Sequence, residues 1–263
     1  MIGIIYFAVI LGACIIGAIV GLGGGVFIRP IFDTMNLHSM LNIQFFSSSA
    51  IFTMAIVSTI KKIQDGTKID ARKALLISIG AVFGGFIGNM LIERLIGMFD
   101  TEDTAGLIQI AATIVVLICS LILTVKSADG KLRFEIKSKL LSLALGIVLG
   151  TVATFLGIGG GPINVPIMII LFGLNIKDAT AYSIVIIFFS HLSRLITMGI
   201  TVGYGYFDVQ MLIFVIPAAI LGGLIGAKFS KIFSETMVRR LFLIAISAVI
   251  VLNIVNAVIL MRA

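Results

Sequence analysis

The segment from Gly21 to Pro30 reads GLGGGVFIRP, and the segment from Gly157 to Pro166 reads GIGGGPINVP. Both fit the pattern G-x-G-G-G-x-x-x-x-P, in a chain that is otherwise rich in Leu, Ile, Val and Phe. A glycine in a helix interior is less favourable than alanine by about 1 kcal/mol, and proline removes a backbone donor. We therefore predict that a helix ends at each of these two glycine clusters, the chain bends tightly, and a new short helix begins.

The composition around the clusters is that of a membrane protein. Of the 263 residues, 60% are hydrophobic and 12% are charged, whereas a soluble domain is nearer half apolar and a quarter charged. A helix needs roughly 20 apolar residues to cross the hydrocarbon core. We predict an all-α polytopic membrane protein with eight long spans, at residues 2–22, 40–60, 73–95, 104–125, 139–157, 178–198, 207–229 and 237–260.

Several other classes of protein are disfavoured by the same sequence. The alternating segments of about 10 residues that form a membrane β-barrel do not occur. The net charge of +7 comes from Lys and Arg in short loops, which is typical of membrane topology and not of nucleic-acid binding. Cys14 and Cys119 lie in apolar spans, and no metal or cofactor motif occurs. The predicted partners are therefore the lipid bilayer and a small solute, and the predicted location is the plasma (inner) membrane, crossed several times.

The glycine clusters belong to a longer internal repeat. They lie 136 residues apart, and further matches follow in register at offsets of 136 and then 138: Ile31 with Ile167, Ser47 with Ser183, Phe52 with Phe188, and Asp70 with Asp208. We predict two homologous halves, 1–126 and 137–263, joined by a polar cytoplasmic linker at 127–136. Internal repeats of this kind are typical of secondary transporters.

The charges favour inverted halves over parallel ones. The loop 61–73 is rich in Lys and Arg, but its equivalent in the second half carries neither. The loop 93–104 has one arginine, Arg94, among four acidic residues, whereas its equivalent in the second half is the basic segment 228–240. Under the positive-inside rule, 61–73, 126–139 and 228–240 then all lie in the cytoplasm. We predict inverted repeats, each with four long transmembrane helices plus a short Gly/Pro-broken half-helix or re-entrant segment. Parallel repeats are the alternative.

The clusters are also the predicted substrate site. Irregular backbone is tolerated in a membrane only inside protein or beside a wet cavity, and a helix N-terminus there offers free N–H groups to an anion. The predicted substrate-binding residues of the two clusters are Gly23, Gly24, Gly25 and Pro30, and Gly159, Gly160, Gly161, Asn164 and Pro166. Close helix packing is the competing interpretation, and we prefer it for the G-G-x-x-G motifs at 84–88 and 222–226.

These features resemble the sulfite exporter TauE/SafE family, also called the toluene-sulfonate uptake permease family. The resemblance rests on the tandem clusters, each followed by an apolar span, a loop ending near Asp, and a span with G-G-x-x-G, and it covers nearly the whole chain. It implies a plasma-membrane permease for small organic or inorganic anions, often sulfur-containing, that is driven by an ion gradient. One position departs from the family pattern, because Arg29 replaces the usual aliphatic residue, which is Val165 in the second copy.

Two arginines lie in apolar segments and are candidate anion ligands. An arginine at membrane depth costs at least ~2.5 kcal/mol, and its guanidinium can bind an oxyanion through two parallel hydrogen bonds. We therefore predict that Arg29 and Arg194 bind substrate; the alternative is that they extend to the membrane surface. Further polar candidates, for which contacts between helices are the alternative role, are Gln44, Ser48, Ser183 and His191.

The candidates for ion coupling are His191, which could relay a proton, and Asp33. The latter lies four residues after Arg29, so an ion pair between them is the alternative. Asp70 and Asp208 are predicted helix N-caps. We predict a secondary transporter for a small anion, such as sulfite, sulfoacetate or thiosulfate, that is coupled to a proton gradient. A membrane-embedded enzyme and a non-transporting structural subunit are the alternatives, and the sequence does not give the oligomeric state.

Overall fold

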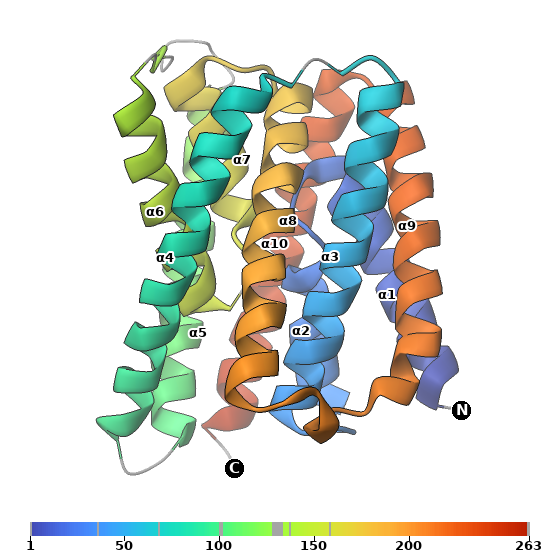
Figure 1. The fold of residues 1–263 in the computed structure, drawn as a ribbon, viewed down its shortest axis with the longest axis vertical. Coiled ribbons are helices and arrows are strands. Elements are labelled where there is room, and N and C mark those ends of the chain that lie inside the picture. The colour runs from blue at the N-terminus through green and yellow to red at the C-terminus, as the bar shows by residue number, and fades with distance from the viewer. Residues whose placement is uncertain are drawn as a thin grey trace.

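The computed structural model describes residues 2–35, 37–67, 69–99, 102–127, 134–136, 138–157 and 159–261. Across these residues the chain forms ten α-helices and no strand (Figure 1), so the predicted all-α fold is confirmed. The helices of the first half are α1 (Ile2–Val20), α2 (Gly25–Met35), α3 (Met40–Gln64), α4 (Ala71–Gly97) and α5 (Glu102–Lys126). Those of the second half are α6 (Lys139–Leu156), α7 (Gly161–Phe172), α8 (Ile176–Thr201), α9 (Leu212–Ile232) and α10 (Glu235–Leu260).

The lengths of the helices match the predicted plan. Eight of the described helices are long and apolar enough to cross a membrane, and each overlaps one of the eight predicted spans. The helices that follow the glycine clusters, α2 and α7, have only 11 and 12 residues. Each half therefore contains four long helices and one short helix, in the same order.

The segment that joins the halves is described only in part. Residues 128–133 of the predicted linker lie outside the described residues. At its end, the backbone N–H groups of Phe134 and Ile136 donate to the carbonyl oxygens of Ile170 and Leu171, in the last turn of α7. The boundaries of the two halves stay a prediction.

The equivalent helices α3 and α8 run in opposite directions (Figure 1). At the lower end of Figure 1, the start of α3 meets the loop after α8, where Asn42 Oδ1 accepts from the backbone N–H of Asp208 at 2.9 Å. At the upper end, the loop after α3 meets the end of α9, where Lys231 Nζ donates to Asp65 at 3.0 Å. Helix α3 thus runs upward and α8 downward. The inverted relation of the halves stays a prediction, and these directions support it.

The G-G-x-x-G motifs lie in two close helix–helix contacts, each of which joins a helix of the first half to a helix of the second half. Helix α4 packs on α6, and α1 packs on α9. A Cβ atom at Gly84 would overlap the carbonyl oxygen of Ile147, and one at Gly226 would lie 2.5 Å from the carbonyl oxygen of Ile15. The glycines let the helix backbones approach directly, so the preferred packing interpretation of these motifs is confirmed.

The contact between α4 and α6 gives a direct test of this packing. Gly84→Ala is expected to destabilise the protein by about 1–3 kcal/mol, because the added methyl group meets rigid backbone. The matched control is Gly85→Ala, whose Cβ would lie at an ordinary 3.4 Å from Thr154 Oγ1. Thermal unfolding of both purified variants in detergent measures the difference. Equal melting temperatures would show that the two helices are not in backbone contact at Gly84.

Candidate functional site

Both clusters bend the chain as predicted, and the glycines do the bending. The residues with positive φ occupy the same three positions in each copy: Gly21 (76°), Gly23 (83°) and Gly24 (70°), and Gly157 (68°), Gly159 (75°) and Gly160 (79°). L side chains rarely adopt this left-handed conformation. The prolines do not contribute to the bend, because Pro30 and Pro166 lie inside the new helices α2 and α7.

The two glycine turns meet in the interior of the protein. A Cβ atom at Gly161 would overlap the backbone of Leu22, so the second cluster packs directly on the first. The buried hydroxyl of Ser183, on α8, donates to the carbonyl oxygen of Gly21 at 2.7 Å. This bond ties the first turn to a helix of the other half.

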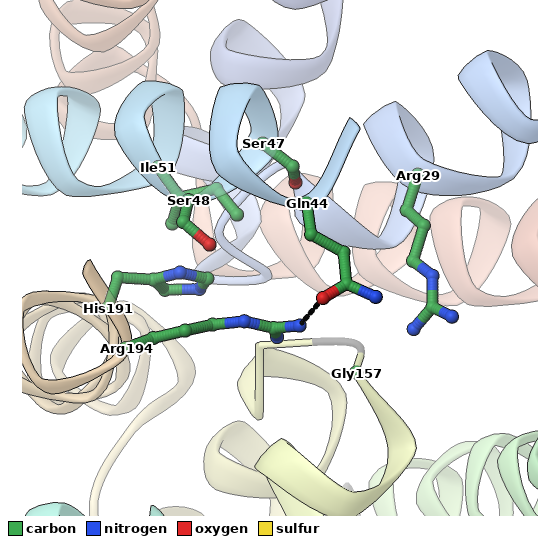
Figure 2. Close-up of a pocket in the computed structure, with 8 residues that line it drawn as sticks. All are labelled: Arg29, Gln44, Ser47, Ser48, Ile51, Gly157, His191 and Arg194. Atoms are coloured by element: carbon green, nitrogen blue, oxygen red, sulfur yellow. Dashed lines mark hydrogen bonds between the residues drawn. The ribbon is translucent and has the colours of Figure 1, made fainter. Parts of the chain in front are cut away.

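A small cavity lies beside the turns, between α2, α3, α8 and the turn after α6 (Figure 2). Its lining consists of Arg29, Gln44, Ser47, Ser48, Ile51, Gly157, His191 and Arg194. The free space is about enough for one water molecule. The structure thus brings together five of the predicted site residues, although they come from both halves of the chain.

Arg194 crosses the cavity from α8 to α3. Its Nη2 donates to Gln44 Oε1 at 2.9 Å, as the dashed line in Figure 2 marks. The side chain therefore lies along the cavity and does not extend to the membrane surface. Within the part of the chain that the structure describes, no carboxylate lies within ion-pair distance of Arg194. A cation withdrawn from water is costly without a counter-charge, so an anion in this cavity would be stabilised.

Arg29 approaches the cavity from the opposite side. Its Nε lies 3.6 Å from Asp33 Oδ2, so the alternative of an ion pair between these two residues is observed. Its Nη2 donates to Gln109 Oε1 at 3.3 Å. A Cβ atom at Gly157 would overlap Arg29 Nη1, so the guanidinium lies directly against the second glycine turn. The cavity thus contains a second guanidinium, and this one has a carboxylate partner.

Gln109, on α5, is a site residue that the sequence reasoning missed. Besides accepting from Arg29, its Nε2 donates to the carbonyl oxygen of Phe155, near the end of α6, at 2.7 Å. It therefore fixes the guanidinium relative to the second glycine turn. The available signal was an isolated amide in the apolar run GLIQIAATIVV.

His191 is buried and has free hydrogen-bonding capacity. Only 4% of its surface is exposed, and neither ring nitrogen has a hydrogen-bond partner among the described residues. A Cβ atom at Gly159 would lie 2.9 Å from Nε2, so the ring lies against the second glycine turn. A buried, unpaired polar group carries a cost in free energy, which a bound anion or water would remove. The alternative role, a hydrogen bond between helices, is not what the described residues show.

A second small cavity also borders His191. It shares His191 and Arg194 with the first, and its other lining residues are Ala153, Thr154, Gly159 and Ser190. His191 and Arg194 therefore line both cavities.

Other predicted site residues lie outside the lining of both cavities: Gly23, Gly24, Gly25, Pro30, Gly160, Gly161, Asn164, Pro166 and Ser183. Gly24 packs on the backbone of Ala13. Asn164 is 1% exposed, and its Oδ1 has no partner among the described residues. Their roles in substrate binding stay predictions.

The two predicted N-caps are confirmed. Asp70 accepts from the backbone N–H of Arg72 and of Lys73, at the start of α4. Asp208 accepts from the backbone N–H of Gln210 at 3.2 Å, at the start of a short 3₁₀-helix before α9. Both carboxylates thus act at helix starts, away from the cavity.

Comparison with known proteins agrees with this architecture. The sequence profile described as "Sulfite exporter TauE/SafE" matches residues 6–252. The "Probable membrane transporter protein YunE" of Bacillus subtilis (strain 168) is 26% identical over 252 residues, which cover 88% of this chain and 90% of the relative. No solved structure matches.

Two further relatives match over a shorter region. The "Probable membrane transporter protein MamO" of Paramagnetospirillum magneticum is 26% identical over 113 residues, or 41% of this chain and 18% of the relative. The "Probable membrane transporter protein MamO" of Magnetospirillum gryphiswaldense is 25% identical over 113 residues, which again cover 41% of this chain and 18% of the relative. Since the profile covers nearly the whole chain, this multi-pass membrane protein belongs to the sulfite exporter TauE/SafE family of membrane transporters.

Proposed function

We propose that this transporter moves a small, sulfur-containing oxyanion, such as sulfite, sulfoacetate or thiosulfate, across the plasma (inner) membrane. The observation that carries the proposal is the pair of guanidinium groups in one cavity. Arg29 and Arg194 come from different halves of the chain and line the same space. Asp33 offsets the charge of Arg29, and Arg194 has no such partner in the described residues. The cavity therefore carries an excess of positive charge that an anion would balance.

The groups around Arg194 suit an oxyanion. A guanidinium presents N–H donors in a planar fork that matches two oxygens of one anion. The hydroxyl groups of Ser47 and Ser48 lie on the adjacent face of α3, as Figure 2 shows, and they can bond to a further oxygen. Because the free space holds about one water molecule, binding requires the side chains of the lining to move apart.

For the transport cycle, we propose that the halves are inverted repeats and that loops 61–73 and 228–240 face the cytoplasm. The antiparallel course of α3 and α8 supports this arrangement, since the two sides of the membrane then present equivalent helices to the substrate. The proposed coupling ion is a proton. His191, with both nitrogens unpaired in the cavity, and Asp33, beside Arg29, are the candidates to carry it.

The alternatives have less support. In a membrane-embedded enzyme, a nucleophile would be activated by a neighbouring base, but no hydrogen bond joins Ser48 to His191 among the described contacts. A purely structural subunit would have no use for an interior histidine without a hydrogen-bond partner or an interior arginine without a carboxylate partner, as His191 and Arg194 are among the described residues, because such groups destabilise the fold.

Transport by purified protein tests the proposal. Reconstituted into liposomes, the protein is expected to exchange radiolabelled sulfite, sulfoacetate or thiosulfate, and a pH gradient is expected to drive net accumulation. The absence of flux for all three anions, in either direction, would overturn the proposed function. A net flux that does not depend on the pH gradient would overturn only the proposed proton coupling.

Arg29→Ala tests the first guanidinium. Loss of one charge-assisted hydrogen bond is expected to weaken binding of the transported anion by about tenfold, which corresponds to ~1.5 kcal/mol. Arg72→Ala is the control, because Arg72 lies exposed at the start of α4. Binding to detergent-purified protein is the measurement, and membrane insertion is expected to be unchanged. An unchanged affinity would remove Arg29 from the site.

A further inference from the structure

Lys62 is a buried cation outside the cavity. It lies near the end of α3 and is 5% exposed. Its Nζ donates to Thr180 Oγ1 on α8 at 3.2 Å and to Ser230 Oγ on α9 at 3.1 Å. The charged groups that face it are Lys177 and Asp178, at the start of α8. Neither forms an ion pair with Lys62, so its charge is unbalanced within the described residues.

The carboxylate beyond Lys62, at the upper end, is already engaged. Asp65 accepts from Lys231 at 3.0 Å and lies 3.5 Å from Lys61 Nζ. The hydrogen bond from Lys231 holds the pKa of the Asp65 carboxyl below its usual value. Asp65 is therefore a charged partner of these two lysines and does not pair with Lys62.

The internal repeat relates the partners of Lys62 and Arg194 to each other. At the offset of 136, Gln44 is equivalent to Thr180, and Ser58 is equivalent to Arg194. Lys62 lies one helical turn beyond Ser58. The contact between Lys62 and Thr180 thus resembles the contact between Arg194 and Gln44, with the cation displaced by one turn of the helix. In each, a cation on a long helix of one half reaches the equivalent polar position at the start of the long helix of the other half.

The two contacts lie on opposite sides of the first glycine turn. Between them, Ile51 of α3 and Ile187 of α8 both lie within 3.5 Å of the Cβ position of Gly23. Gln44 and Lys62 are separated by about 27 Å along α3, at roughly 1.5 Å per residue. One small anion cannot reach both cations, so they mark separate positions along the interface of α3 and α8.

We infer that Lys62, Thr180 and Ser230 form a second site for the oxyanion. It lies on the side of the glycine turns where α3 ends, which is also the side where α5 ends and α6 begins in Figure 1 and is called the linker side below. The inference rests on the proposed function and adds a second binding site to the proposed transport pathway. The ammonium has three donors, of which two bond to hydroxyl groups, so one is available to an anion. Thr180 donates its own proton to the carbonyl oxygen of Lys177, which leaves the hydroxyl of Ser230 as the second donor.

Measuring uptake from each side of the membrane tests this site. Right-side-out and inverted vesicles from a bacterial expression host are supplied with radiolabelled thiosulfate. Lys62→Gln is expected to raise the KM about tenfold on the linker side, since one charged donor is lost, and to leave the KM on the other side within about twofold, because Lys62 lies roughly 27 Å from Gln44. Lys62→Arg is expected to restore most of the affinity. Lys61→Gln, which removes a neighbouring charge from the half-exposed Lys61, is the matched control.

Each outcome decides between the two proposals. An equal rise in KM from both sides, or no rise with Lys62→Gln, would overturn the second site while normal uptake by the wild-type chain kept the proposed function. Absence of wild-type uptake from both sides would overturn the proposed function and the second site together. If Lys62→Gln does not reach the membrane, Thr180→Val, which keeps the volume of the side chain, takes its place under the same sidedness criterion.

Discussion

Arg194→Gln is expected to lower the affinity for the transported anion by about 10- to 150-fold, or ~1.5–3 kcal/mol. Arg194 is the cation of the cavity without a carboxylate partner among the described residues, and it bonds to the neutral Gln44 at 2.9 Å. Replacing it with a neutral amide removes the charge and the planar pair of donors, while leaving a polar side chain beside Gln44. The fold is therefore expected to survive, and the loss is expected in binding.

Two further variants separate charge from geometry. Arg194→Lys keeps the charge but lacks the planar fork of donors, so its affinity is expected to lie between those of the wild type and Arg194→Gln. Arg94→Gln removes an exposed arginine from the last turn of α4 and is expected to bind normally. Equilibrium binding of radiolabelled thiosulfate to detergent-purified protein is the measurement. Wild-type affinity in Arg194→Gln would show that the anion binds elsewhere.

The sequence was sufficient to predict the two arginines as site residues, because both lie within apolar segments. A charge within an apolar segment is expensive, so Arg29 and Arg194 stood out without any knowledge of their neighbours. The lengths of the apolar runs similarly predicted the eight long helices, and the Gly/Pro clusters predicted the two short ones. What they could not give is that Gln44, from the other half, lies beside Arg194, since that contact depends on the packing of α3 on α8.

Lys62 shows the opposite case. In the sequence it belongs to a basic run after an apolar span, which is the usual pattern of a loop on the cytoplasmic side. In the structure it is buried, and its hydrogen-bond partners Thr180 and Ser230 lie more than a hundred residues further along the chain. Gln109 was missed for a similar reason, because an isolated amide acquires meaning only through the arginine that it contacts. Both omissions concern tertiary contacts and not local structure.

The glycine clusters allow a test in which equivalent residues of the repeat behave differently. Gly161→Ala is expected to destabilise the protein by about 3 kcal/mol, at the upper end of the range for an added group in a packed interior. The methyl group would overlap the backbone of Leu22. That residue cannot move aside easily, because Gly21 and Gly23 hold the turn on either side of it with positive φ. In a chain of this size, the loss corresponds to a fall of roughly 6–12 °C in melting temperature.

Gly25→Ala is the matched comparison, since Gly25 and Gly161 occupy the same position in the two clusters and each begins a short helix. Its Cβ would overlap only Cδ1 of Ile51, the far end of a flexible side chain that can change rotamer. We therefore expect a loss below about 1 kcal/mol. Thermal unfolding of the two variants in detergent measures the contrast, and equal melting temperatures would contradict it. The pattern G-x-G-G-G-x-x-x-x-P has glycine at both positions. Of the two, only Gly161 lies so close to the backbone of the other half that a side chain would overlap it.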